Sequence, residues 1–268
     1  MIAAAGLAVY LGPPGRKPAP VPKKVSVPMP PPDIPMDMPR DVKVVAVIID
    51  DLGHNPQAAR PFLEMSYPVA LSLLPDRPFS KAIAEEVVAS GKTLLLHQPM
   101  EPAGYPDTDP GPGAILIDQD PEQIRQILER NVGSIPGVVG INNHMGSRAT
   151  TDPVIMEAVL GFVRERGFFF IDSRTTADTI GFTMAREKGL KTAERDVFLD
   201  NDPDPAAIDR RVRELLDLAD RRGWAIGIGH ASTQTAAALE RMARTARERE
   251  ILWISLESLI TCYADPGN

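Results

Sequence analysis

Residues 45–55 read VAVIIDDLGHN, a run of five apolar residues that leads directly into two neighbouring carboxylates. A short, continuous and partly β-branched apolar run predicts a strand that is buried on both faces. Asp50 and Asp51 would then stand at the carboxyl end of that strand. Because α/β folds form their sites at the carboxyl ends of strands, the doublet marks a candidate functional site.

The chain from residue 41 onward repeats this pattern. Strands are expected at Val42–Ile49, Val69–Leu74, Thr93–Leu96, Val138–Ile141, Phe168–Ile171, Val197–Leu199, Ala225–Ile228 and Ile251–Ile254, and helices at 55–65, 79–90, 121–133, 152–166, 204–222 and 233–248. Asp120, Asp152 and Asp204 each precede a proline, which indicates a capping residue followed by proline in the first helical turn. Strands that alternate with helices predict an α/β fold whose parallel sheet closes into a barrel or near-barrel.

Charge and the N-terminal composition limit partners and location. The net charge is −7, and residues 1–40 carry five basic and two acidic side chains (+3), so the remainder carries −10. Such a charge fits a phosphate backbone poorly, and we expect no nucleic-acid partner. Residues 1–12 are apolar and residues 13–39 hold 11 prolines, which predicts an unfolded tether over 1–40 and a folded domain over 41–264.

The apolar start, residues 1–12, is too short to span a bilayer and has no basic flank. We interpret it as the remnant of a longer membrane anchor or signal. This predicts a periplasmic domain, free or held at the inner membrane. A plain disordered tail is the alternative, and it would allow a cytoplasmic protein.

Polar residues of unusual type also follow the other expected strands. They are His97 and Glu101 in LLLHQPMEP, His144 and Arg148 in INNHMGSRAT, Asp172, Ser173 and Arg174 in DSRTT, and His230 in GHAS. The carboxyl ends of parallel strands meet at one edge of a sheet, so these side chains should lie together. A structural role for any single histidine is the simpler reading, but three at equivalent positions beside a carboxylate pair favour a metal or acid–base site.

Imidazole nitrogen and carboxylate oxygen together suit Zn²⁺, and three protein ligands with an open position form the catalytic type of zinc site. Asp51, His97 and His144 can supply that set, although Ni²⁺, Co²⁺ and Mn²⁺ also fit it. Neighbouring side chains on a strand alternate in direction, so one aspartate would bind the metal and the other, Asp50, would lie beside the water. Alternatively, one carboxylate of the doublet caps the following turn.

Five segments together give the chain a recognisable signature. They are IIDDLG (48–53), HQPMEP (97–102), NHMGSRAT (143–150), FIDSRT (170–175) and GIGHAS (227–232). In these the sequence resembles the divergent, YibQ-like polysaccharide deacetylases, a branch of the NodB-type carbohydrate deacetylases of the bacterial envelope. The resemblance implies a distorted (β/α) barrel and metal-dependent removal of acetyl from an N-acetylated sugar. It also implies that Asp50 is the general base, Asp51 a metal ligand and His230 the general acid.

The chain departs from the standard deacetylase pattern in two places. The second ligand histidine, four residues after the first, is replaced by Glu101, and the Arg-x-Pro-Tyr motif is absent. The resemblance therefore leaves His144, with Glu101 as second choice, to supply the third ligand. These departures also keep open a non-catalytic protein that binds glycan or a partner.

Further candidates surround the expected site. Asp172 would hold His230 or Arg174 in place, or else cap the strand end. Arg148 would contact sugar or a carboxylate, or else lie in solvent. Ser173 completes the candidates for substrate binding or support of the site.

Overall fold

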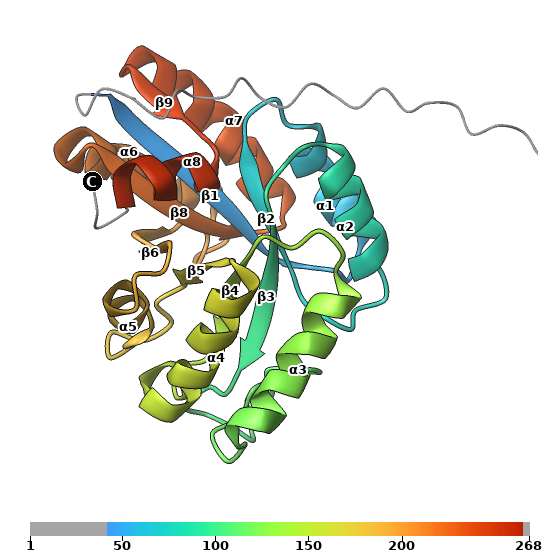
Figure 1. Cartoon of the computed structure of the whole chain (residues 1–268). Coiled ribbons are helices and arrows are strands. Elements are labelled where there is room, and N and C mark those ends of the chain that lie inside the picture. The colour runs from blue at the N-terminus through green and yellow to red at the C-terminus, as the bar shows by residue number, and fades with distance from the viewer. Residues whose placement is uncertain (1–41, 265–268) are drawn as a thin grey trace, which may run out of the picture.

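The computed structural model describes residues 42–264, which alternate strands and helices along the chain (Figure 1). The strands are β1 Lys43–Leu52, β2 Val69–Leu73, β3 Leu94–Met100, β4 Gly140–Met145, β5 Phe169–Asp172, β6 Thr192–Glu194, β7 Val197–Phe198, β8 Trp224–His230 and β9 Ile251–Trp253. The helices are α1 Pro56–Glu64, α2 Ser80–Ala89, α3 Pro121–Ser134, α4 Pro153–Arg166, α5 Gly181–Glu187, α6 Pro205–Arg222, α7 Thr233–Glu248 and α8 Leu256–Leu259, with a 3₁₀ turn η1 Ala149–Thr151 and a π-helical turn η2 Ile260–Ala264. The predicted tether, residues 1–40, lies outside this range.

The strands form one parallel sheet that curls into a half-barrel, with helices around its outside (Figure 1). The order is β6-β5-β4-β3-β2-β1-β8-β7, and β9 pairs with the start of β1. Only Arg195 and Asp196 separate β6 from β7 in the chain, so this short link joins the two outer strands of the curled sheet. The predicted α/β class and the predicted closure of the parallel sheet toward a barrel are thus confirmed.

Local sequence explains where the helices begin. Asp120, Asp152 and Asp204 each accept hydrogen bonds from backbone N–H groups of the first helical turn, and a proline follows each of them. An aspartate cap satisfies an amide that the helix itself leaves unpaired. The Asp-Pro pairs therefore begin α3, α4 and α6 as the sequence predicts. The expectations missed the short elements β6, α5 and α8, whose apolar patterns are too brief to read.

Two apolar layers stabilise the sheet. Outward-facing residues such as Val45, Val47 and Ile49 of β1 pack against the helices, whereas Val44, Ala46 and Ile48 pack inside the curl. The inner cluster also contains Leu256, Leu259 and Ile260 from α8 and η2, so the C-terminal helical segment fills part of the curled interior. Across residues 42–264, no helix is both long enough and apolar enough to span a membrane.

Candidate metal and acid–base site

Strand alternation decides which polar side chains enter the curl. Because Val44, Ala46 and Ile48 face inward, the same period directs Asp50 inward, and this residue is only 2% exposed. By the same reasoning, the inner face carries Ser72 of β2, His97 of β3, Asn142 and His144 of β4, and His230 of β8. β3 and β4 run on through their polar residues, so His97 and His144 lie within strands rather than beyond them.

A bulge in β1 brings the second aspartate to the same place. The pairing with β2 advances from Ile49–Leu71 to Leu52–Leu73, so β1 has one extra residue at the doublet. Asp51 adopts φ 61°, in the left-handed region that aspartate enters more readily than most residues. Asp50 Oδ2 and Asp51 Oδ1 lie 3.6 Å and 3.2 Å from His97 Nε2. The two aspartate side chains therefore do not point to opposite faces of the sheet, as regular strand alternation predicts. The bulge lets both carboxylates reach the imidazole of His97.

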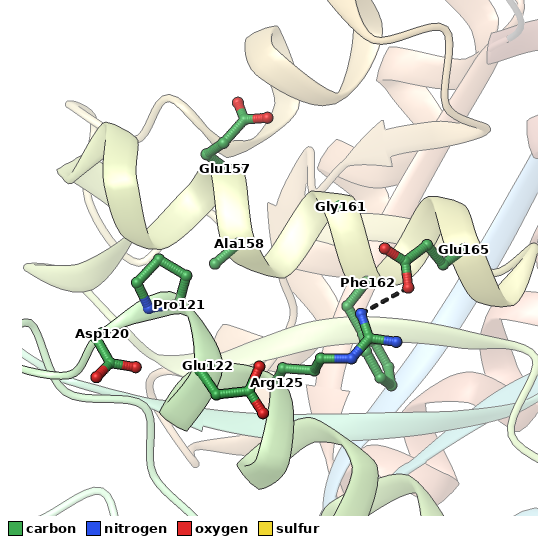
Figure 2. Close-up of a pocket in the computed structure, with 9 residues that line it drawn as sticks. All are labelled: Asp120, Pro121, Glu122, Arg125, Glu157, Ala158, Gly161, Phe162 and Glu165. Atoms are coloured by element: carbon green, nitrogen blue, oxygen red, sulfur yellow. Dashed lines mark hydrogen bonds and ion pairs between the residues drawn. The ribbon is translucent and has the colours of Figure 1, made fainter.

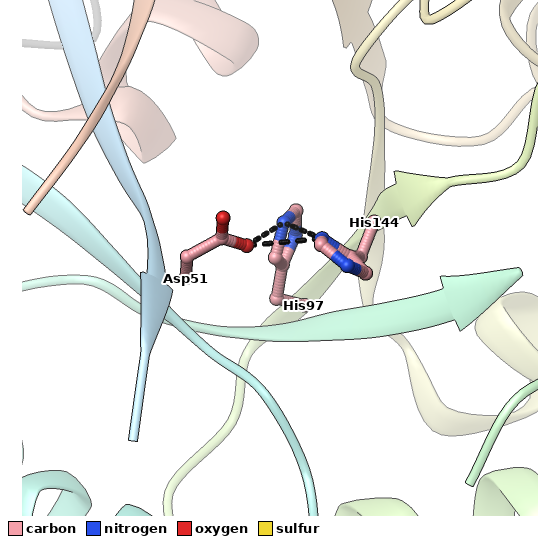
Figure 3. A group of neighbouring side chains, drawn as sticks. All are labelled: Asp51, His97 and His144. Atoms are coloured by element: carbon pink, nitrogen blue, oxygen red, sulfur yellow. Dashed lines mark hydrogen bonds and ion pairs between the residues drawn. The ribbon is translucent and has the colours of Figure 1, made fainter. Parts of the chain in front are cut away.

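Asp51, His97 and His144 converge on one point (Figure 3). Asp51 Oδ1 lies 3.2 Å from His97 Nε2 and 2.9 Å from His144 Nδ1, and the two nitrogens are 3.2 Å apart. Two ligands about 2.05 Å from a tetrahedral zinc ion would be roughly 3.3 Å apart, close to all three distances. Within residues 42–264, Asp51 Oδ1 is buried and accepts no hydrogen bond of acceptable geometry. The three donor atoms therefore fit a shared divalent cation.

Burial and neighbouring charges shift the pKa values of Asp50, Asp51 and His144. Burial raises the pKa of the Asp50 carboxyl. Burial acts in the same sense on Asp51, but the imidazoles of His144 and His97 outweigh it and hold the pKa of Asp51 well below its usual range. Burial lowers the pKa of His144, so this imidazole favours the neutral form that binds metals.

His230 lies at the other side of the site, where its imidazole pairs with the carboxylate of Asp200. Its Nδ1 lies 2.8 Å from Asp200 Oδ1, and its backbone N–H donates to Asp200 Oδ2. Thr235 also donates to Asp200 Oδ2, so the carboxylate is held from two sides. The hydrogen bond that His230 Nδ1 donates to the Asp200 carboxylate raises the pKa of His230 to about 9, against the effect of burial. His230 Nε2 faces the metal group, 3.8 Å from Asp51 Oδ2.

Asp200 was missed among the sequence candidates, although the rule that found the others applies to it. It follows directly on the expected strand Val197–Leu199. The partner considered for His230, Asp172, instead accepts hydrogen bonds from the backbone N–H of Arg174 and Phe182 and from the Thr179 hydroxyl. Asp172 therefore caps the end of its own strand and holds the backbone of Arg174. The carboxylate that holds His230 is Asp200.

The remaining candidates support loops around the site. Glu101 is not in the metal group: its Oε1 accepts from Arg148 at 2.8 Å and its Oε2 from the backbone N–H of Ile117. Arg148 thus contacts a carboxylate of the protein. Arg174 pairs with Glu194 at 3.2 Å. Ser173 is buried and accepts a hydrogen bond from Asn142.

A surface pocket of about 550 Å³ lies between α3 and α4 (Figure 2). Its lining includes Glu122, Glu157 and Glu165, and Arg125 pairs with Glu165 across it. None of the metal-group or acid–base residues lines this pocket.

Comparison with known proteins agrees with the class that the fold and site define, a NodB-like deacetylase half-barrel. The family model for divergent polysaccharide deacetylases matches residues 47–260, and the chain belongs to that family. The chain is 32% identical to the uncharacterized protein YibQ of Escherichia coli K12 over 74% of its length and 61% of that protein's length. It is 28% identical to an uncharacterized Haemophilus influenzae protein, over 76% of its length and 72% of that protein.

Solved structures extend the similarity. An uncharacterized protein of Agrobacterium tumefaciens C58 has a TM-score of 0.77 and 26% identity, over 81% of this chain and 89% of that one. The peptidoglycan N-acetylglucosamine deacetylase Bc1960 has a TM-score of 0.51 at 12% identity, over 82% of this chain and 89% of that one. A mutant of a CE4 family pseudoenzyme with restored enzymatic activity has a TM-score of 0.53 at 14% identity, over 82% of this chain and 68% of that one. At these identities the last two share the fold alone.

Proposed function

We propose that this protein is a metal-dependent deacetylase that removes acetyl groups from an N-acetylated polysaccharide of the bacterial cell envelope. The observation that carries the proposal is the convergence of three ligand atoms within 3.2 Å of one another, with a buried carboxylate and a carboxylate-held imidazole beside them. Such a set of groups suits metal-assisted hydrolysis of an amide.

Asp51, His97 and His144 would hold the cation, with zinc as the expected metal. A bound divalent cation supplies Lewis acidity, which lowers the pKa of a water molecule and polarises the acetyl carbonyl. The reaction breaks the C–N bond of the acetamido group and yields acetate and a free amine.

Asp50 and His230 would move the protons. Asp50 takes the proton of the attacking water, since its carboxylate lies 3.6 Å from the same nitrogen that Asp51 approaches. His230 has its Nδ1 engaged by Asp200, so its Nε2 is the atom that delivers a proton to the departing nitrogen. Such positioned groups typically contribute about 10²–10⁴-fold each to the rate.

A non-catalytic protein that binds glycan or a partner is the second candidate. Its support is the altered motif, because Glu101 is engaged with Arg148 and Ile117 instead of joining the metal group. A CE4 family pseudoenzyme shares this fold.

Acetate release separates the two candidates. Purified protein with one equivalent of zinc would be incubated with N-acetylglucosamine oligomers, peptidoglycan fragments and chitin, with Asp50→Asn as the matched control. The proposal expects acetate from at least one substrate and a loss of that activity in the variant. No release from any substrate, with glycan binding that Asp50→Asn leaves unchanged, would favour the binding protein.

We further propose a periplasmic location, free or anchored at the inner membrane, from the apolar and proline-rich residues 1–39. A C-terminal reporter fusion should be active outside the cytoplasm. Activity only in the cytoplasm would contradict this location.

A further inference from the structure

One buried amide lies between the proposed base and a proposed metal ligand. Asn142 of β4 is fully buried, and each of its hydrogen-bonding positions has a partner. Its Oδ1 accepts from Ser72 Oγ at 2.5 Å and lies 3.0 Å from His97 Nδ1. Its Nδ2 lies 2.9 Å from Asp50 Oδ1 and 3.2 Å from Ser173 Oγ. No other side chain in residues 42–264 contacts both Asp50 and His97 through hydrogen bonds of its own.

The partners determine which way the amide faces. An ionised carboxylate only accepts hydrogen bonds, so the NH₂ group must face Asp50 and the oxygen must face His97. An amide oxygen in turn accepts from His97 only if its Nδ1 carries the proton. In the neutral imidazole, His97 Nε2 is then left with its lone pair toward Asp51, which is the tautomer that a metal ligand needs.

We propose that Asn142 is a positioning residue that couples the base to the metal site: it holds the Asp50 carboxylate with its nitrogen and selects the ligand tautomer of His97 with its oxygen. The inference rests on the proposed function for the roles of Asp50 and His97. The contacts themselves do not depend on it. Ser72 assists by occupying the second lone pair of the amide oxygen, which disfavours rotation of the amide.

Two substitutions separate the two halves of this role. Asn142→Asp keeps an oxygen toward His97 and Ser72 but puts a second carboxylate against Asp50. Asn142→Ala removes both contacts. Asn131→Ala is the control, because Asn131 is an equally buried amide that donates to Gln98 and Gly113 away from the metal group.

Three readouts are needed: the His97 tautomer by ¹⁵N NMR without metal at a pH where the imidazole is neutral, the zinc Kd by chelator competition, and acetate release. Asn142→Asp should keep the Nδ1–H tautomer and retain zinc affinity, while acetate release falls on the order of 100-fold. Asn142→Ala should give mixed tautomers and zinc binding weaker by about 10–100-fold. Asn131→Ala should lower the Tm and leave tautomer and affinity unchanged.

The results distinguish this inference from the proposed function. If the wild type releases no acetate, the proposed function fails, and the tautomer and affinity measurements still decide the role of Asn142. An unchanged tautomer in Asn142→Ala would overturn the inference. If that variant does not fold, the nearly isosteric Asn142→Asp decides it, because loss of the Nδ1–H tautomer there would equally overturn it.

Discussion

The same chemical change at two neighbouring residues should weaken metal binding at one of them, Asp51, and leave it unchanged at the other, Asp50. Asp51→Asn removes the charge from the oxygen that lies within 3.2 Å of both imidazole nitrogens, whereas Asp50→Asn alters a carboxylate held by Asn142. Asparagine is preferable to alanine because Asp51 has φ 61°, a conformation that asparagine tolerates. Both variants keep the shape of the wild-type side chain, so differences report on charge.

The expected size follows from linkage. Free zinc at 100 times its Kd stabilises the folded state by about 2.7 kcal/mol. For a domain of this size, 1 kcal/mol shifts the Tm by about 2–4 °C, so zinc should raise the wild-type Tm by about 5–11 °C. A 100-fold weaker site at the same zinc concentration would be stabilised by only about 0.4 kcal/mol, which is a shift of about 1–2 °C.

Scanning calorimetry of chelator-treated protein, with and without buffered zinc, measures these shifts. Asp50→Asn should retain the wild-type increase and Asp51→Asn should lose most of it. An equal loss in both variants would mean that both carboxylates bind the metal and that Asp50 is not the base. A wild-type Tm that zinc does not change would refute the metal site itself.

Three further outcomes can be checked independently. Asp50→Asn should lower acetate release by about 10²-fold or more in steady-state assays while zinc content stays at the wild-type level, and an unaltered rate would exclude Asp50 as the base. Asp200→Asn should leave zinc binding intact and reduce turnover about 10-fold or more, because it weakens the contact that orients His230, and equal kinetics would show that the contact is only structural. Gly140→Ala should lower the free energy of unfolding by about 1–3 kcal/mol in urea titrations, because its Cβ would lie 2.5 Å from a ring carbon of Phe169. Gly161→Ala is the matched control, since no neighbouring atom lies within 4 Å of its Cβ, and it should not destabilise α4.

Features set by short-range interactions could be read from the sequence. Apolar runs predict strands because a buried parallel strand has apolar neighbours on both faces, and Asp-Pro pairs predict helix starts because the cap bonds only to its own first turn. The three-residue strand Thr192–Glu194 could not be read, because its pairing with Phe169–Asp172 defines it more than its own composition does.

The candidate site divides in the same way. The sequence by itself determined that Asp51, His97 and His144 follow apolar runs, and parallel topology is enough to bring such positions to one edge. The tertiary structure alone decided that a bulge turns both aspartates toward His97, and that His230 pairs with Asp200 while Asp172 caps its own strand. These features depend on strand register and on contacts between residues far apart in the chain, such as the 92 positions between Asp50 and Asn142, which no local pattern encodes.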